Sequence, residues 1–204
     1  MPAITTLLRD LVPIRPLTLP EAMRIAELQA SHFIQQLALD GPPFPESAIA
    51  ELPRVQVERM KLIGLSGATE WSHGRWLIVL NGSESATRQR FSLAHEYKHV
   101  LDHPFITVIY PPLHAATSEG RAEQMCDYFA GCLLMPRTWL KRAWGEGTQD
   151  ANALARRFSV SRAAMNVRLF QIGILQPTDR HHPPTTGPGY RRLAGTKDDL
   201  ACPA

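Results

Sequence analysis

The chain has 204 residues, of which 44% are hydrophobic and 20% are charged, and its formal net charge is +3. This length predicts one domain with appendages, and this hydrophobic content is enough to bury a core. The charge is too small to argue for nucleic-acid or membrane binding. Three cysteines without a C-x-x-C pair are poor material for a disulfide framework, and the first residues lack the pattern of a signal peptide. We therefore expect a cytoplasmic protein.

The first eighty residues predict helices followed by strands. Residues 1–17 give at most a short helix, whereas Thr18 and Glu21 form a capping box that opens a helix with apolar spacing to about residue 39. A short helix is expected over 45–52. The spacing then alternates, which predicts strands over residues 55–60, 65–71 and 75–80.

Two longer helices are expected next. Ser85 is a suitable N-cap for the first, which ends at His103 and Pro104. The FITVIYPP stretch that follows predicts a short strand or an extended connection. The second helix runs from about Glu119 to Met135. These elements make the fold class α+β, a mainly helical core with a sheet of about three strands.

The first long helix contains an H-E-x-x-H motif, made by His95, Glu96 and His99. Residues four apart share a helix face, so both imidazoles can reach one metal ion while Glu96 faces a water held there. Zinc suits this pattern because it accepts neutral nitrogen ligands and keeps a position open for water. Manganese or iron can occupy such a site as well. The motif predicts peptide hydrolysis with Glu96 as general base.

The second long helix offers a third ligand. Glu123 and Asp127 also lie four residues apart, so Glu123 can ligate the metal while Asp127 accepts the free ring N–H of a ligating histidine. Glu119 and His114 are alternative third ligands. For stabilising the oxyanion of the reaction, the sequence offers Tyr110, His103 and His114 without deciding among them.

Residues 150–175 have the outline of a helix-turn-helix segment, with two short amphipathic patterns around Ser159 to Ser161. The surrounding chain is its most basic part. Arg162, Asn166 and Arg168 could contact DNA or a protein partner from the second helix. The alternative function is therefore a DNA-binding transcriptional regulator that uses residues 150–175, with the remaining fold as a sensing or docking module.

The stretch RQRFSLAHEYKH, followed by EQMCDYFAGCLLMP, resembles the ImmA/IrrE family of zinc metallopeptidases. The resemblance spans residues 20–175 and implies a zincin-like (gluzincin) core. Position by position, it implies the metal ligands His95, His99 and Glu123, the catalytic Glu96, and Asp127 as partner of a ligating histidine. Two departures are Tyr97-Lys98 and Cys126-Asp127, where the family often has Leu-Gly and Ala-Asn. Lys98 puts a bulky cation inside the motif helix, which argues against close packing there.

The resemblance also implies how a substrate is held. The strand ending with Val79, Leu80 and Asn81 matches the sheet edge along which such enzymes bind an extended peptide as an added strand. The implied substrate is a helix-turn-helix repressor or antitoxin of bacterial or phage regulation or stress response. No membrane partner is expected.

These inferences divide the chain into four segments. They are an N-terminal extension (1–17), a zincin-like metallopeptidase domain (18–147), a helix-turn-helix-like segment (148–176) and a tail (177–204) expected to be disordered because it has little to bury.

Overall fold

The computed structural model describes residues 3–112 and 117–175. Its helices are α1 (Ile4–Arg9), α2 (Leu19–Gln36), α3 (Ser47–Ala50), α4 (Ala86–Asp102), α5 (Ile106–Ile109), α6 (Ser118–Leu134), α7 (Arg137–Gly145), α8 (Ala151–Phe158) and α9 (Arg162–Gln171). Its strands are β1 (Val55–Met60), β2 (Gly67–Ser72) and β3 (Arg75–Asn81). The α+β fold class is confirmed. The expected disorder of the tail concerns residues outside the described part.

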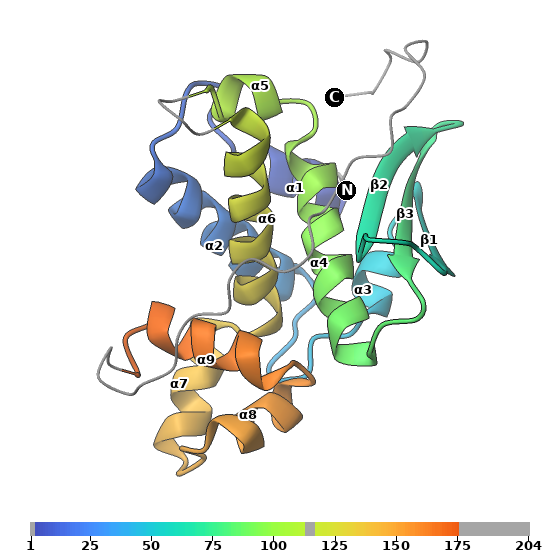
Figure 1. Ribbon diagram of the computed structural model, residues 1–204. Helices are drawn as coiled ribbons and strands as arrows, with labels where there is room; N and C mark the ends of the chain where they lie inside the picture. Colours follow the sequence, from blue (N-terminus) through green and yellow to red (C-terminus); the bar gives the residue numbers. More distant parts are fainter. Residues whose placement is uncertain (1–2, 113–116, 176–204) are drawn as a thin grey trace.

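The molecule is layered around α4. One side of α4 packs on β2 and β3, its other side packs on α6, and α6 in turn packs on α2 (Figure 1). Helices α7, α8 and α9 form a separate group at one end of these layers (Figure 1). Because α4 is covered on both sides, most of its second half is buried, including polar residues of the H-E-x-x-H motif. No helix in the described ranges combines the length and apolarity needed to cross a membrane.

The sheet has the order β1-β3-β2, with β1 parallel and β2 antiparallel to β3. Strand β3 is therefore central, and the interpretation of Val79, Leu80 and Asn81 as a substrate-binding edge is wrong. Val79, for example, pairs with Glu58 on one side and with Ala68 on the other. Both rows of backbone groups on β3 are used within the sheet, so no room remains for an added peptide.

The side chain of Asn81 has a structural task instead. Residues 61–66 connect β1 to β2 and pass the end of β3, where Asn81 Nδ2 donates to the carbonyls of Leu62, at 3.1 Å, and Leu65, at 2.9 Å. The amide thereby satisfies backbone carbonyls that have no strand partner. Asn81 fixes the crossover that separates β1 from β2.

Two segments differ from the sequence expectations. The FITVIYPP stretch contains the short helix α5 and no strand. Pro136, directly after the helix expected to end at Met135, is the N-cap of α7, whose Trp139, Leu140 and Ala143 are buried at helical spacing. Proline is favoured at helix starts because its missing N–H would have no acceptor there. The sequence reading missed α7 for that reason.

Candidate metal centre

The site lies where α4 and α6 face each other. Ser85 caps α4 by accepting a hydrogen bond from the backbone of Arg88, and Thr117 caps α6 in the same way through Gly120. The caps set where each helix begins and hence which face meets the other. His95 and His99 then lie one turn apart on α4, with their ring centroids 5.1 Å apart.

Glu123 on α6 reaches both imidazoles. Its two carboxylate oxygens lie 3.2 Å from His95 Nε2 and 3.1 Å from His99 Nε2. Nitrogen and oxygen ligands of a tetrahedral zinc ion lie about 3.4 Å apart, because each bond to the ion is about 2.1 Å long. The spacing of these donor atoms therefore fits a metal ion bound by His95, His99 and Glu123.

Asp127, one turn beyond Glu123, contacts the other nitrogen of His95. The distance from Asp127 Oδ1 to His95 Nδ1 is 2.9 Å, although the carboxylate is half exposed. A carboxylate on Nδ1 orients the ring and leaves Nε2 directed at the metal position. This is the geometry that the E-x-x-x-D spacing predicts.

The charges of the site are strongly coupled. Burial by itself would lower the pKa of His95, but hydrogen bonds to Asp127 and Glu123 outweigh it and raise that pKa to about 9. Burial would raise the pKa of Glu123, but the hydrogen bonds from His95 and His99 outweigh it and lower that pKa to about 2. These hydrogen bonds favour an ionised Glu123 and a protonated His95 in the metal-free site, so a metal ion and a proton would compete for His95.

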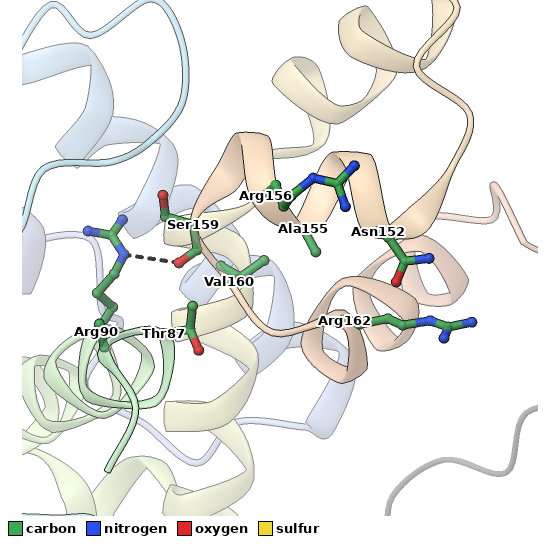
Figure 2. A pocket seen from close by; sticks show the side chains of 9 residues that line it. Thr87, Arg90, Asn152, Ala155, Arg156, Ser159, Val160 and Arg162 are labelled. Carbon is green, nitrogen blue, oxygen red and sulfur yellow. Dashed lines mark hydrogen bonds between the residues drawn. The ribbon is translucent and has the colours of Figure 1, made fainter. Parts of the chain in front are cut away.

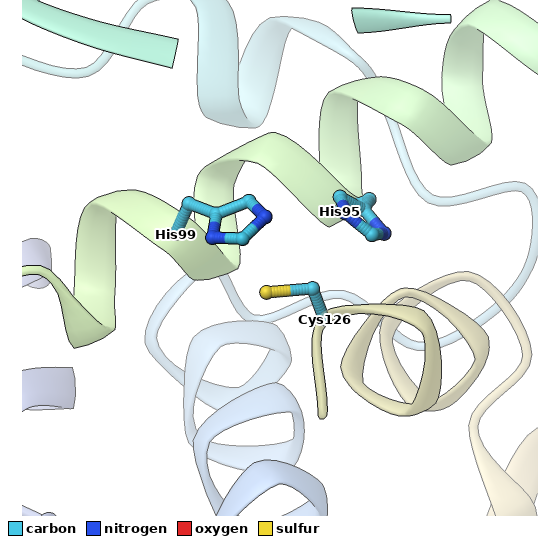
Figure 3. Close-up of side chains that lie close together, drawn as sticks. All are labelled: His95, His99 and Cys126. Carbon is cyan, nitrogen blue, oxygen red and sulfur yellow. The ribbon is translucent and has the colours of Figure 1, made fainter. Parts of the chain in front are cut away.

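Cys126 is a further possible donor. Its sulfur and one nitrogen each of His95 and His99 lie within 4.8 Å of one another, so this group too is close enough to hold a metal ion. Figure 3 shows the thiol on α6 facing the two imidazoles. Burial raises the pKa of Cys126 well above its ordinary value, which opposes the thiolate that a metal needs. Since Glu123 already contacts both imidazoles as a carboxylate, we favour Glu123.

Glu96 faces the sheet from the same turn of α4. Its Oε2 accepts a hydrogen bond of 2.6 Å from the hydroxyl of Thr69 in β2. Its Oε1 is buried and has no hydrogen-bond partner among the described residues. Burial raises the pKa of Glu96, which brings a carboxylate closer to the proton affinity of a general base.

Gly67 makes this placement possible. A Cβ atom at this position would lie 2.9 Å from Glu96 Oε1, which is too close for two non-bonded atoms. The close approach of β2 to the Glu96 side chain therefore relies on the missing Cβ of residue 67. No sequence motif marked Gly67 or Thr69, since their role depends on how β2 packs against α4.

Lys98, inside the motif, does not disturb the packing. Its Nζ donates at 2.7 Å to Asp102, one turn on, and to Gln29 of α2. Tyr110 donates its hydroxyl hydrogen to the other oxygen of Asp102, also at 2.7 Å. These buried groups form a closed network that joins α2, α4 and the end of α5. In the sequence, the i, i+4 spacing of Lys98 and Asp102 was the signal that could have predicted this ion pair.

The same contact removes one of the oxyanion candidates. Tyr110 is buried and bound to Asp102, so its hydroxyl does not face the metal position. His103 packs its ring on Trp76, with centroids 4.9 Å apart. His114 lies outside the described residues. Tyr97 packs on Phe33, and its hydroxyl forms a hydrogen bond with that of Thr5.

The three predicted contact residues on α9 differ in exposure. Arg162 is exposed and Asn166 is partly exposed at the start and middle of α9. Arg168, in contrast, is only 1% exposed and donates to the carbonyl of Met135 and to Glu27. Its prediction as a DNA or partner contact is wrong, because its guanidinium fastens α9 to the end of α6 and to α2.

Comparison with known proteins fits this geometry. The profile of the Peptidase_M78 family, described as the IrrE N-terminal-like domain, matches residues 53–170, more than half of the chain. The chain belongs to this family. The matched range includes β1 to α8 and nearly all of α9, and therefore every residue of the candidate metal centre.

Two similar proteins illustrate the relationship. The radiation response metalloprotease IrrE of Deinococcus radiodurans is 28% identical over 155 residues, which cover 71% of this chain and 45% of that protein. The chain thus spans less than half the length of this relative. A solved structure of a Mycobacterium tuberculosis transcriptional regulator superposes with a TM-score of 0.59 at 18% identity, covering 88% of this chain and 55% of that one. This second likeness concerns the fold alone.

Proposed function

We propose that the chain is a zinc-dependent endopeptidase whose metal is held by His95, His99 and Glu123. The observation that carries the proposal is the approach of the Glu123 carboxylate to both imidazoles from a separate helix. Membership in a metallopeptidase family supports it. When bound, zinc supplies a Lewis acid that acidifies a water molecule and polarises a carbonyl.

Glu96 performs the proton transfers. Its unpartnered Oε1 takes a proton from the attacking water and then delivers it to the nitrogen of the leaving amine, so the peptide bond is broken and a carboxylate and an amine are formed. Thr69 holds the other oxygen of Glu96 throughout and fixes its orientation. Asp127 keeps the His95 ring in the orientation that ligation needs.

Strand β2 replaces β3 as the proposed binding edge for the substrate. Within the described residues, β2 pairs only with β3, so its outer row of N–H and C=O groups is available. An extended peptide added there would pass Gly67 and Thr69, the two residues that contact Glu96. The substrate is therefore an exposed, extended loop.

The proposed protein substrate is a helix-turn-helix repressor or antitoxin, as the family resemblance implies. The alternative of a DNA-binding regulator is weaker, because one of its three proposed contacts, Arg168, is buried. Manganese or iron in place of zinc would leave the roles of the side chains unchanged.

The test uses a single conservative change. Glu96→Gln should retain the metal and lower the cleavage of a helix-turn-helix protein encoded beside this chain by about a hundredfold or more, because the general base is lost. Cleavage is followed by electrophoresis and metal content by mass spectrometry. Glu119→Gln, an exposed change on α6, should cut at the normal rate. Undiminished cleavage by Glu96→Gln would refute the mechanism.

A further inference from the structure

A second concave site lies at the N-terminal end of α4, away from His95 and His99. It is a cavity of about 560 Å³ between the first turn of α4, the face of α8 and the start of α9. The lining residues are Ala86, Thr87, Arg90, Asn152, Ala155, Arg156, Ser159, Val160 and Arg162. Figure 2 shows that they come from α4, α8, α9 and the turn between α8 and α9, and that one arginine stands on each of the three helices. This volume is in the range of pockets that bind small molecules.

The charge of the cavity is entirely of one sign. Arg90, Arg156 and Arg162 line it, and no aspartate or glutamate is among the lining residues. Arg156 and Arg162 are exposed, and within the described ranges neither makes an ion pair or a side-chain hydrogen bond. Neighbouring Arg157, by comparison, is paired with Glu146 at 3.2 Å. Two arginines thus keep their donors available beside one cavity.

Arg90 has a structural role, because its hydrogen bonds hold together segments that form the wall of the cavity. Its Nε donates to the carbonyl of Ser159 at 3.1 Å, drawn as the dashed line in Figure 2, and its other end donates to the carbonyl of Phe44 at 2.7 Å. Burial lowers the pKa of Arg90, and Glu46, at 3.6 Å, offsets this only in part. Arg90 therefore holds the turn between α8 and α9 against α4, while its own donors are engaged by protein groups.

The backbone adds to the positive charge that lines the cavity. Ala86 and Thr87 are the first two residues of α4, a helix of 17 residues, and their N–H groups have no acceptor inside the helix. Arg162 is likewise the first residue of α9. The cavity therefore combines side-chain and backbone donors that favour an anion with several oxygen acceptors.

We propose that this cavity binds a phosphate group, through Arg156 and Arg162 and the first turn of α4. The guanidinium groups match phosphate because they donate two parallel hydrogen bonds. None of the lining residues is aromatic, so no base or ring is stacked and recognition is of the phosphate itself. The phosphate can belong to a free polyphosphate-type ligand or to a nucleic-acid backbone.

The test compares two double variants of the full chain that lose equal charge. Arg156→Gln with Arg162→Gln removes the free donors of the cavity, whereas Arg24→Gln with Lys141→Gln removes two exposed charges elsewhere. Inorganic pyrophosphate and a short DNA duplex are titrated calorimetrically at one salt concentration. Any withdrawal of metal by pyrophosphate would be the same in all variants, so the difference between them reports on the cavity.

We expect the wild type to bind pyrophosphate, the cavity variant to bind about tenfold or more weakly, and the control to stay within about twofold. Binding of the duplex alone, lost in the cavity variant and kept in the control, would assign the phosphate to a nucleic-acid backbone. Binding of neither probe at millimolar concentration, or an equal loss in both variants, would overturn the proposal. The melting temperatures of both variants without ligand verify that they are folded.

Discussion

Lys98 places a positive charge in the interior, and the residues around it compensate that charge. Lys98 and Asp102 are each about 1% exposed, and Gln29 and Tyr110 supply the remaining partners. Such a pair adds little net stability compared with apolar residues, but the loss of one partner leaves the other charge buried alone. The network is therefore expected to affect the stability of the chain mainly when one of its charged partners is removed.

Lys98→Met should lower the free energy of unfolding by about 3–5 kcal/mol, because Asp102 would remain charged and buried. Urea denaturation of the metal-free chain measures it. Adding Asp102→Asn should recover part of the loss, since no lone charge is left. Arg157→Gln, which breaks an exposed pair, should cost less than about 1 kcal/mol. An equally small effect for Lys98→Met would contradict the buried network.

In the proposed metal centre, Asp127 would act on the metal only through His95. Asp127→Ala should weaken zinc binding by about tenfold, the lower end of the usual range, because the Asp127 carboxylate is half exposed. Competition with a chromogenic chelator measures the affinity. Glu119→Ala, on the same helix, should leave it unchanged. If Asp127→Ala binds zinc as tightly as the wild type, the Asp127–His95 contact does not orient a ligand.

At the scale of elements, the missing side chain of Gly67 lets β2 lie close to Glu96 of α4. Gly67→Ala would put a methyl group 2.9 Å from Glu96 Oε1 and displace that carboxylate. A displacement of about 1 Å can cost a hundredfold in rate, so cleavage should fall by about that factor while the metal stays bound. Gly145→Ala, where the added methyl meets nothing within 4 Å, should cut normally. Steady-state cleavage rates measure this effect. A fully active Gly67→Ala variant would show that the close approach of β2 to Glu96 is not needed for cleavage.

Elements also differ in how far the sequence could predict them. The motif helices follow from local signals, because caps and i, i+4 spacing fix which side chains share a face. The order of the strands does not, since pairing depends on contacts between distant segments. The sequence therefore did not predict that β3 is central or that Arg168 is buried, although it did predict a strand at β3 and a helix around Arg168.

For the whole molecule, metal binding and folding should be linked, since the proposed ligands come from two helices. At a free metal concentration of about 100 times Kd, zinc should stabilise the chain by about 2.7 kcal/mol. Thermal melts with and without a chelator measure this. The stabilisation should be largely lost in Glu123→Ala and kept in Cys126→Ala. The reverse pattern would make Cys126 the third ligand in place of Glu123.

The crossover held by Asn81 has a consequence for how the protein ages. Asn81 precedes Gly82, and attack of a glycine nitrogen on the preceding amide is little hindered because glycine has no Cβ. In the folded chain, that nitrogen donates to Met60 and the amide holds two carbonyls, so the reacting groups are both engaged. Deamidation at Asn81 should then proceed only when this end of the sheet opens.

Deamidation of Asn81 would loosen the crossover permanently. A carboxylate at position 81 could no longer donate to the carbonyls of Leu62 and Leu65, so the crossover would stay loose once opened. Peptide mass spectrometry should find slower deamidation in native than in urea-treated protein, and equal rates would exclude this protection. The deamidated fraction of Asn81 would then increase with the number of times that this end of the sheet has opened.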